Sequence, residues 1–136
     1  MPRIYVDGIY DLFHEGHLDG LQKAKNFREN TTLIIGVIGD EDATKYKRPP
    51  IMNENERFKI ISAMSLVDEV IFPAPLHVSN EFLERHNIDI VLHGFSNQED
   101  FEKQKEFFKD IECAFYQIPY STSNSTSAII EKIKNQ

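Results

Sequence analysis

The chain of 136 residues contains a single cysteine, and it has no long apolar run. Because Cys113 has no second cysteine to pair with, an intramolecular disulfide is excluded, which is typical of proteins in a reducing cytoplasm. Apolar runs such as Leu33–Ile35 and Ile90–Leu92 have the length of strands and are too short to cross a bilayer. The N-terminus also lacks the basic-then-apolar layout of a secretion signal. We therefore expect a cytoplasmic protein that makes no use of a membrane.

Positive charge is also scarce, since 15 lysines and arginines face 22 acidic residues and the net charge is −7. This balance argues against a surface that binds nucleic acid. It does not exclude a small ligand rich in phosphate, because local donors rather than the overall field bind such a ligand. An acidic enzyme that handles a triphosphate usually also needs a divalent cation. We therefore expect Mg²⁺ as a cofactor, although the sequence points to no ligand site for it.

Short apolar runs alternate with amphipathic segments along the chain. The apolar runs are rich in Ile and Val without clear alternation, which is typical of a parallel sheet covered on both faces. The predicted strands are Arg3–Asp7, Thr32–Ile38, Glu69–Phe72, Asp89–His93 and Cys113–Ile118. The predicted helices are His17–Phe27, Glu54–Ser65, Asn80–His86, Glu99–Lys109 and Thr126–Lys134. This order predicts one α/β domain, residues 1–136, with a doubly wound parallel five-stranded sheet in a three-layer αβα sandwich.

Polar residues stand where most of the predicted helices begin. Asn53 and Glu56 have the spacing of a capping box, and Ser79, Asn97 and Ser125 stand at the starts of the later helices. Capping is the commonest role of such residues. In an open parallel sheet, however, the same junctions also line the ligand crevice at the carboxyl ends of the strands.

The stretch Tyr5–His17 leads from a predicted strand through a turn to two histidines, His14 and His17, where a helix is expected to begin. As a metal site the pair is poor, because no third ligand is obvious nearby. Chance is another explanation for two histidines in one loop. In this context, however, Gly8 and Gly16 allow close approach to a ligand, and free N–H groups at a helix start suit phosphate. Two imidazoles can donate to oxygens that gain charge when a nucleophile attacks an α-phosphate, so the stretch predicts a nucleotidyltransferase.

Several motifs resemble those of the cytidylyltransferase family, which includes the phosphocholine, phosphoethanolamine and glycerol-3-phosphate enzymes. Gly8–His17 resembles the family's His-x-Gly-His signature, and Met52–Arg57 resembles a segment of the phosphocholine enzymes. Val67–Val70, Glu81–Asp89 and Ser125–Ile130 continue the similarity over almost the whole chain. The resemblance implies a Rossmann-like catalytic domain, which would act as a homodimer.

The resemblance also implies roles for single residues. His14 and His17 match the pair that stabilises the transition state at the α-phosphate, and Lys47 matches the lysine that bridges the phosphates of substrate and nucleotide. A solvated loop lysine is the alternative for Lys47. Arg57 matches an arginine expected near the nucleotide. Its alternative is a surface helix arginine paired with Glu54 or Glu56, an arrangement that stabilises little.

Asp7 matches an acidic residue that faces the cationic head of the alcohol, and Asp11 matches an aspartate that supports the loop. The segment Ser125–Ser127 would place hydroxyls and amides on the phosphates, or it caps the last helix. The nucleotide-binding candidates are therefore Gly8, Ile9, Tyr10, Asp11, Phe13, Arg57, His93, Ser125, Thr126 and Ser127. The acceptor-binding candidates are Asp7, Lys47, Leu76, Phe95 and Tyr120.

The chain departs from the family at three of these positions. Tyr120 stands where the closing motif has a phosphate-binding arginine, and Arg48 is a candidate to compensate. Phe95 stands where the family has a carboxylate near the base and ribose. Leu76 stands where the phosphocholine enzymes have a tryptophan, and this chain contains no tryptophan. Phe101, with Phe95 and Tyr120, could rebuild an aromatic face or pack in the core.

The function predicted on this basis is transfer of CMP from CTP to a phosphorylated small alcohol, with release of pyrophosphate. Phosphocholine or phosphoethanolamine is the favoured acceptor. One enzymatic alternative is a different acceptor, either glycerol-3-phosphate or another phospho-alcohol. The other is transfer of an adenylyl group in place of a cytidylyl group. A divergent homologue that only binds nucleotide or a partner is the non-catalytic alternative. The chain has no long basic amphipathic helix that would attach it to a membrane.

Overall fold

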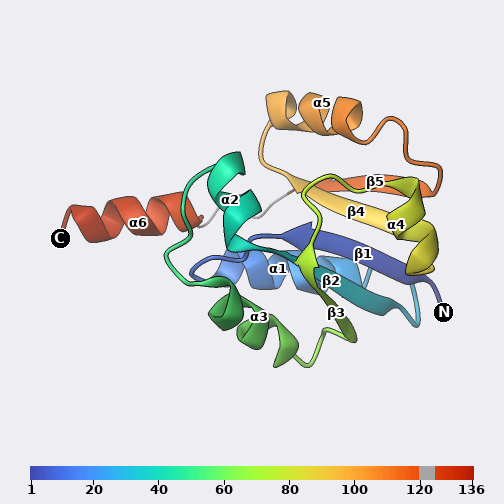
Figure 1. The fold of residues 1–136 in the computed structure, drawn as a ribbon, viewed down its shortest axis with the longest axis horizontal. Helices are drawn as coiled ribbons and strands as arrows, with labels where there is room; N and C mark the ends of the chain where they lie inside the picture. Colours follow the sequence, from blue (N-terminus) through green and yellow to red (C-terminus); the bar gives the residue numbers. More distant parts are fainter. Residues whose placement is uncertain (120–124) are drawn as a thin grey trace.

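The computed structural model describes residues 1–119 and 125–136, and its centre is a parallel sheet of five strands (Figure 1). The strands lie in the order β3-β2-β1-β4-β5, and every pair of neighbours is parallel. Their bounds are β1 Arg3–Gly8, β2 Thr32–Ile38, β3 Glu69–Ala74, β4 Ile90–Phe95 and β5 Ala114–Pro119. The predicted α/β class with a doubly wound parallel sheet is confirmed.

Strand β1 is central and pairs with β2 from Arg3 opposite Thr32 to Gly8 opposite Val37. From Leu33 onward, every residue of β2 is buried. This burial explains why the apolar run of β2 shows no alternation, since both faces of the strand lie in the core. The sheet therefore fixes where β1 and β2 end, and the functional site lies at those ends.

Six helices surround the sheet in the described ranges. Their bounds are α1 Glu15–Lys25, α2 Asp40–Tyr46, α3 Glu54–Ser62, α4 Asn80–Arg85, α5 Gln98–Phe107 and α6 Thr126–Lys134. Two separate apolar clusters show that both faces of the sheet are covered. One cluster includes Leu21 and Ile61 from α1 and α3, and the other includes Phe82 from α4 and Phe108 at the end of α5.

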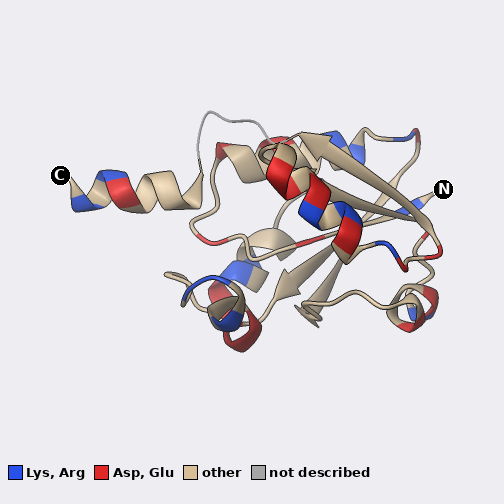
Figure 2. Cartoon of the chain, turned by 90° about the horizontal axis from the view of Figure 1, so that it is seen from above, with Lys and Arg blue, Asp and Glu red and all other residues tan. Residues whose placement is uncertain are grey.

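Helix α6 differs from the others because none of its residues is buried. It extends beyond the sheet in both views (Figures 1 and 2). Figure 2 also shows acidic and basic residues interspersed along α5, where Lys103 pairs with Glu99 at 3.1 Å. None of the helices in the described ranges has both the length and the apolar character needed to cross a membrane.

The sequence-based elements are correct apart from one helix and several ends. Helix α2 was not predicted, because Ala43 is its only buried residue and its sequence has no apolar stripe. Helix α1 begins at Glu15, two residues before the predicted start, since His14 serves as its N-cap. The capping box of Asn53 and Glu56 is confirmed at the start of α3.

Candidate active site

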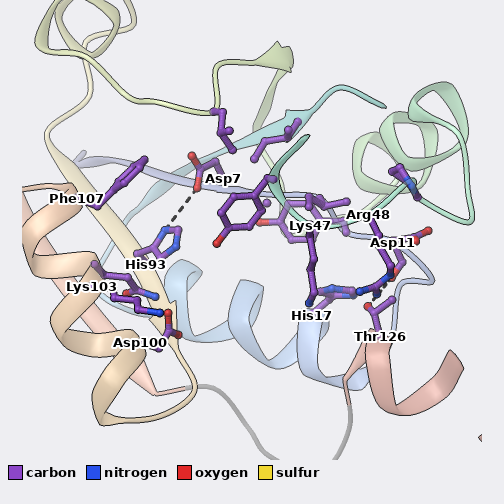
Figure 3. A pocket seen from close by; sticks show the side chains of 18 of the residues that line it. Asp7, Asp11, His17, Lys47, Arg48, His93, Asp100, Lys103, Phe107 and Thr126 are labelled. Atoms are coloured by element: carbon purple, nitrogen blue, oxygen red, sulfur yellow. Dashed lines mark hydrogen bonds and ion pairs between the residues drawn. The ribbon is translucent and has the colours of Figure 1, made fainter. Parts of the chain in front are cut away.

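A cavity of about 440 Å³ opens at the carboxyl ends of β1, β2 and β4, where ligands bind in open parallel sheets (Figure 3). It is lined by Asp7, Gly8, Ile9, Tyr10, Asp11, His17, Ile38, Tyr46, Lys47, Arg48, Pro50, Leu76, His93, Asp100, Lys103, Gln104, Phe107, Phe108 and Thr126. Figure 3 shows two groups at opposite sides of the cavity. His17, Lys47, Arg48 and Thr126 lie on one side, and His93 and Phe107 lie on the other.

The two histidines of the loop after β1 stack on each other, with ring centroids 3.9 Å apart. Nδ1 of His14 accepts a hydrogen bond from the N–H of Gly16 at 3.0 Å, and Nδ1 of His17 accepts one from the N–H of His14 at 3.2 Å. A neutral imidazole whose Nδ1 accepts a hydrogen bond carries its proton on Nε2. Both rings are therefore held as Nε2–H donors. Of the two, His17 lines the cavity, and His14 lies directly behind it.

Burial keeps both histidines neutral. Burial is the main cause that lowers the pKa of His17, to about 4, with the neighbouring His14 as a second cause. Burial also lowers the pKa of His14. Neutral imidazoles do not repel each other, so His14 can stack on His17 while His17 donates into the cavity. This arrangement suits the stabilisation of oxygens that gain negative charge during a reaction.

Gly8 leaves room for an aromatic ring in this loop. A Cβ at Gly8 would lie 2.9 Å from Cε2 and Cζ of Tyr10. Tyr10 itself has a φ of 58°, which is the left-handed region, and its buried ring lies 5.4 Å from the ring of His17. Phe13 contacts the other side of the pair, with its ring centroid 5.3 Å from that of His17. The glycine thus serves the packing that holds His17 in place.

Asp11 joins three segments around the histidines. Its two carboxylate oxygens accept from the N–H groups of Ile51 and Met52, at 2.7 and 2.9 Å. Its carbonyl oxygen accepts from Oγ1 of Thr126 at 2.9 Å. The predicted supporting role of Asp11 therefore has a physical basis, because this residue ties the histidine loop to the α2–α3 loop and to the start of α6. Only Pro49 and Pro50 separate that part of the α2–α3 loop from Lys47 and Arg48.

Lys47 ends α2 as its C-cap and lines the cavity on the same side as His17 (Figure 3). The side chain is exposed over much of its surface. Partial burial lowers the pKa of the ammonium, and the charge of Arg48 lowers it further. Among the described residues, Lys47 forms no ion pair, which leaves its charge available to an anion in the cavity.

Arg57 does not lie on the surface of α3, so the alternative of a surface arginine paired with Glu54 or Glu56 is wrong. The side chain is fully buried and forms an ion pair with Asp40 at 2.7 Å. Its guanidinium also donates to three backbone carbonyl groups, those of Ile9, Ile38 and Met52. It is not among the residues that line the cavity, and it holds together the loops that do.

The opposite side of the cavity combines a carboxylate with aromatic rings. The side chain of Asp7 is 7% exposed, and its Oδ1 lies 3.5 Å from Nδ1 of His93. The ring of Phe107 is exposed and stacks on His77, with ring centroids 4.9 Å apart. Leu76 lines the same cavity. The aromatic wall of the cavity is therefore Phe107 of α5, and not the predicted Phe95 and Phe101.

Phe95 and Phe101 do not form this wall. Their rings pack edge to face on each other at 4.9 Å, and neither residue lines the cavity. A carboxylate does reach the cavity from α5, since Asp100 lines it and its Oδ2 accepts from the N–H of Ser96 at 3.0 Å. No signal in the sequence distinguished Phe107 or Asp100 from other residues of an exposed helix.

The structure brings together most of the predicted site. The predicted residues that line the cavity are Asp7, Gly8, Ile9, Tyr10, Asp11, His17, Lys47, Leu76, His93 and Thr126. The predicted residues that do not line it are Phe13, His14, Arg57, Phe95, Ser125 and Ser127. Tyr120 lies outside the described residues. Ser125 is the N-cap of α6, as the capping alternative proposed, and its hydroxyl accepts from the N–H of Ala128.

The chain offers no cage of its own for a metal ion in the parts that the structure describes. No three side chains of His, Cys, Asp or Glu gather there as ligands. Both oxygens of Asp11 already accept backbone hydrogen bonds, and Asp7 is nearly buried beside His93. The donor set therefore does not fit a site built from protein ligands. Mg²⁺ commonly binds through substrate phosphates with few protein ligands, and this mode needs no such cage.

The amino-acid sequence is similar to those of known cytidylyltransferases. Choline-phosphate cytidylyltransferase A of Rattus norvegicus is 48% identical over 91 residues, which are 67% of this chain and 25% of that protein. The ethanolamine-phosphate cytidylyltransferase of Mus musculus is 35% identical over 117 residues, which are 82% of this chain and 28% of that protein. The chain thus matches about a quarter of the length of these relatives.

Solved structures share the fold at lower identity. A lipopolysaccharide core biosynthesis protein from Thermoplasma volcanium superposes with a TM-score of 0.71 and 22% identity, over 91% of this chain and 99% of that one. A pantoate-beta-alanine ligase from Francisella tularensis superposes with a TM-score of 0.55 and 16% identity, over 93% of this chain and 61% of that one. Both share the Rossmann-like arrangement of a parallel sheet between helices.

A model of the cytidylyltransferase-like family matches residues 5–132, from β1 through most of α6. The match therefore includes the histidine loop, Lys47 and the first turn of α6, which together form one side of the cavity. By this match, the chain belongs to the cytidylyltransferase-like family.

Proposed function

We propose that the chain transfers CMP from CTP to a phosphorylated small alcohol, giving a CDP-alcohol and pyrophosphate. One observation carries this proposal. His17 lines an open cavity with its proton on Nε2 and with the neutral His14 stacked on it, and it shares one side of that cavity with the ammonium of Lys47, which forms no ion pair within the described part of the chain. Such a set of donors matches a reaction in which charge develops on phosphate oxygens and no covalent enzyme intermediate is required.

The reaction needs one displacement at phosphorus. An oxygen of the acceptor phosphate forms a bond to the α-phosphorus of CTP from one side. The bond from the α-phosphorus to the oxygen that bridges to the β-phosphorus breaks on the other side, and its electron pair leaves with pyrophosphate. The Nε2–H of His17 donates to an α-phosphate oxygen, with His14 behind it to orient the ring. Lys47 draws the two anionic reactants together.

The acceptor is proposed to carry a cationic head, as phosphocholine and phosphoethanolamine do. Asp7 supplies a nearly buried carboxylate, and Phe107 supplies an exposed ring on the same cavity. A carboxylate and an aromatic face both attract an ammonium group. Glycerol-3-phosphate carries no such charge and would gain nothing from either group. This side of the cavity therefore favours the choline or ethanolamine acceptor over a neutral one.

Three further expectations belong to the same proposal. Mg²⁺ would bind together with the triphosphate and reduce the net charge of the nucleotide. The proposed displacement requires no protein ligand to this ion. The chain would act as a homodimer. It would act in the cytoplasm, where CTP and phospho-alcohols are available.

The test is a pyrophosphate-release assay with CTP, Mg²⁺ and each of phosphocholine, phosphoethanolamine and glycerol-3-phosphate. We expect release with the first two acceptors and a rate near background for His17→Ala. If no nucleotide and acceptor give release above that variant, the protein is not a nucleotidyltransferase. A thermal-shift comparison of CTP with ATP tests the base, and a larger shift with ATP would favour adenylyl transfer. A shift with CTP in the absence of any turnover would favour a homologue that only binds nucleotide.

A further inference from the structure

We propose that Arg48 is a second cationic ligand of the nucleotide, which grips the β- and γ-phosphates together with the first turn of α6. This inference rests on the proposed function and adds a residue to its binding site. Arg48 follows Lys47 directly in the α2–α3 loop, and it lines the cavity on the same side as His17 (Figure 3).

Arg48 is the arginine that lacks a conventional partner in residues 1–119 and 125–136. Arg3 and Arg57 pair with Glu69 and Asp40, and Arg85 pairs with Glu81. The remaining arginine, Arg28, lies over the ring of Phe27. Arg48 makes neither kind of contact within these ranges, although it is half-buried.

The guanidinium of Arg48 is poorly satisfied by its surroundings. Its Nη1 donates to Oγ of Ser127 at 3.3 Å, and its Nε is buried with no hydrogen-bond partner among the residues that the structure describes. A buried donor on a charged group costs free energy unless an acceptor meets it. Phosphate oxygens meet a guanidinium through two parallel hydrogen bonds and carry the opposite charge. A ligand phosphate would therefore complete a site that the chain leaves incomplete.

Several carboxylates of the histidine loop and of α2 are already engaged. Both oxygens of Asp11 accept from the backbone of the α2–α3 loop. On α2, Asp40 pairs with Arg57 and Glu41 pairs with Lys45. The adjacent cations Lys47 and Arg48 thus have no acidic partner in the described part of the chain. Like charges held side by side repel each other, and an anion bound between them would remove this cost.

The first turn of α6 lies within reach of the same anion. Oγ of Ser127 accepts from Arg48, and Oγ1 of Thr126 donates to the carbonyl of Asp11 and lines the cavity. The free N–H groups at the start of this nine-residue helix suit a phosphate. Because His17 and Lys47 serve the reacting α-phosphate in the proposed mechanism, the site of Arg48 belongs to the leaving pyrophosphate.

The test compares how strongly variants bind CTP, CMP and inorganic pyrophosphate, by calorimetry in the presence of Mg²⁺. For Arg48→Gln we expect the Kd of CTP and of pyrophosphate to rise about tenfold to a hundredfold, the effect of losing a charge-assisted donor. The Kd of CMP should change less than about twofold, because CMP lacks the phosphates that Arg48 would hold. Arg48→Lys should bind CTP and pyrophosphate more tightly than Arg48→Gln does but less tightly than the wild-type chain. Lysine keeps the positive charge but cannot form the two parallel hydrogen bonds of a guanidinium. Arg85→Gln, on an exposed arginine of α4 away from the cavity, is the matched control.

Unchanged binding of CTP and pyrophosphate in Arg48→Gln would overturn the inference, and so would equal losses for CMP and CTP. Melting temperatures of the unliganded variants should agree, so that a loss of affinity is not a loss of folding. The outcome is separable from that of the proposed function. If the wild-type chain binds pyrophosphate through Arg48 but releases none from CTP, the anion site stands and the transferase activity does not. If the wild-type chain binds neither CTP nor pyrophosphate, both fail.

Discussion

His17 is a histidine whose neutral form is built into the fold. Its Nδ1 accepts from the backbone of His14, and burial lowers its pKa to about 4 from 6.5. Between these two pH values the unfolded chain binds a proton at this residue and the folded chain does not. The contribution of His17 to stability is therefore complete above about pH 6.5 and is lost as the pH falls towards 4.

Replacing His17 with Asn should remove this pH dependence. Asn keeps a side-chain oxygen that can accept from the N–H of His14, but it does not titrate. We expect the free energy of unfolding of His17→Asn to fall less steeply between pH 6.5 and 4, by up to about 1.4 kcal/mol per pH unit. Urea unfolding at half-unit steps of pH measures this slope. Parallel curves for the variant and the wild-type chain would show that His17 is not held neutral in the fold.

Lys47 carries the charge that is proposed to bridge both reactants. For Lys47→Ala we expect the KM values of CTP and of the acceptor to rise together, each on the order of tenfold or more, because one charge-assisted contact is lost to each. Steady-state kinetics with each substrate varied in turn would measure the effect. An unchanged KM for either substrate would remove the bridging role. Lys45→Ala provides the control, since Lys45 is an exposed partner of Glu41 on the same helix.

At the scale of elements, the starts of α2 and α3 are bonded to each other. The N–H of Asp40 donates to Oε1 of Glu54 at 2.8 Å, and the N–H of Glu54 donates to Oδ2 of Asp40 at 3.2 Å. Arg57 adds its ion pair to Asp40 and its contacts to the ends of β1 and β2. The segment 40–54, which contains α2 and the loop with Lys47 and Arg48, is therefore fixed at both of its ends, which limits the entropy lost when a ligand binds there.

Because Arg57 bonds to several segments at once, replacing it should lower the free energy of unfolding. Arg57→Lys keeps the charge but cannot reach three carbonyls and a carboxylate at once, so buried acceptors lose their donor. We expect a loss of about 2–4 kcal/mol in the free energy of unfolding, measured by urea denaturation. Arg85→Lys, whose exposed pair with Glu81 contributes little, should lose less than about 1 kcal/mol. Similar losses in the two variants would contradict the role assigned to Arg57.

Local sequence was a good guide to the strands and a poor one to long-range partners. The apolar runs marked every strand, and the capping box of Asn53 marked the start of α3. The sequence placed Arg57 near the nucleotide, with a surface arginine beside Glu54 and Glu56 as the alternative, and it did not indicate a buried position. Apart from the nearby carbonyl of Met52, its partners lie 17 to 48 residues away in the chain. Such contacts depend on how β1 and β2 end side by side, and no local pattern reports this.

The candidate site divides in the same way. The histidine pair lies within one distinctive segment, and Lys47 lies shortly before another that begins at Met52, so both were predicted. The aromatic wall was not, because Phe107 and Phe108 are adjacent and only the helix geometry decides which ring faces outward. Phe108 is 5% exposed and Phe107 is 47% exposed. A sequence alone does not fix that difference.

At the scale of the whole molecule, the cavity separates two kinds of recognition. His17, Lys47 and Arg48 gather on one side. The other side combines the carboxylates of Asp7 and Asp100 with the ring of Phe107, and the lysine there, Lys103, pairs with Glu99. A substrate with a phosphate at one end and a positive charge at the other would therefore be oriented by both sides. This polarity explains how a chain with a net charge of −7 could bind a triphosphate.

Acceptor choice tests this division. For Phe107→Leu we expect kcat/KM for phosphocholine to fall about twofold to thirtyfold, the range of a cation–π contact of roughly 0.5–2 kcal/mol. The value for glycerol-3-phosphate should not change. Phe95→Leu is the matched control, because its ring packs on Phe101 outside the cavity. An equal loss for both acceptors would mean that Phe107 shapes the cavity without recognising charge.

The hydrogen bond from Thr126 to the carbonyl of Asp11 joins residues 115 positions apart. During synthesis the chain emerges from its N-terminus, so the histidine loop leaves the ribosome long before the helix that completes its surroundings. All five strands precede Thr126, and the sheet can pair before α6 exists. A nascent chain would thus form its core first and complete the phosphate site last. Nucleotide binding would therefore be delayed until the sheet that supports the site has formed.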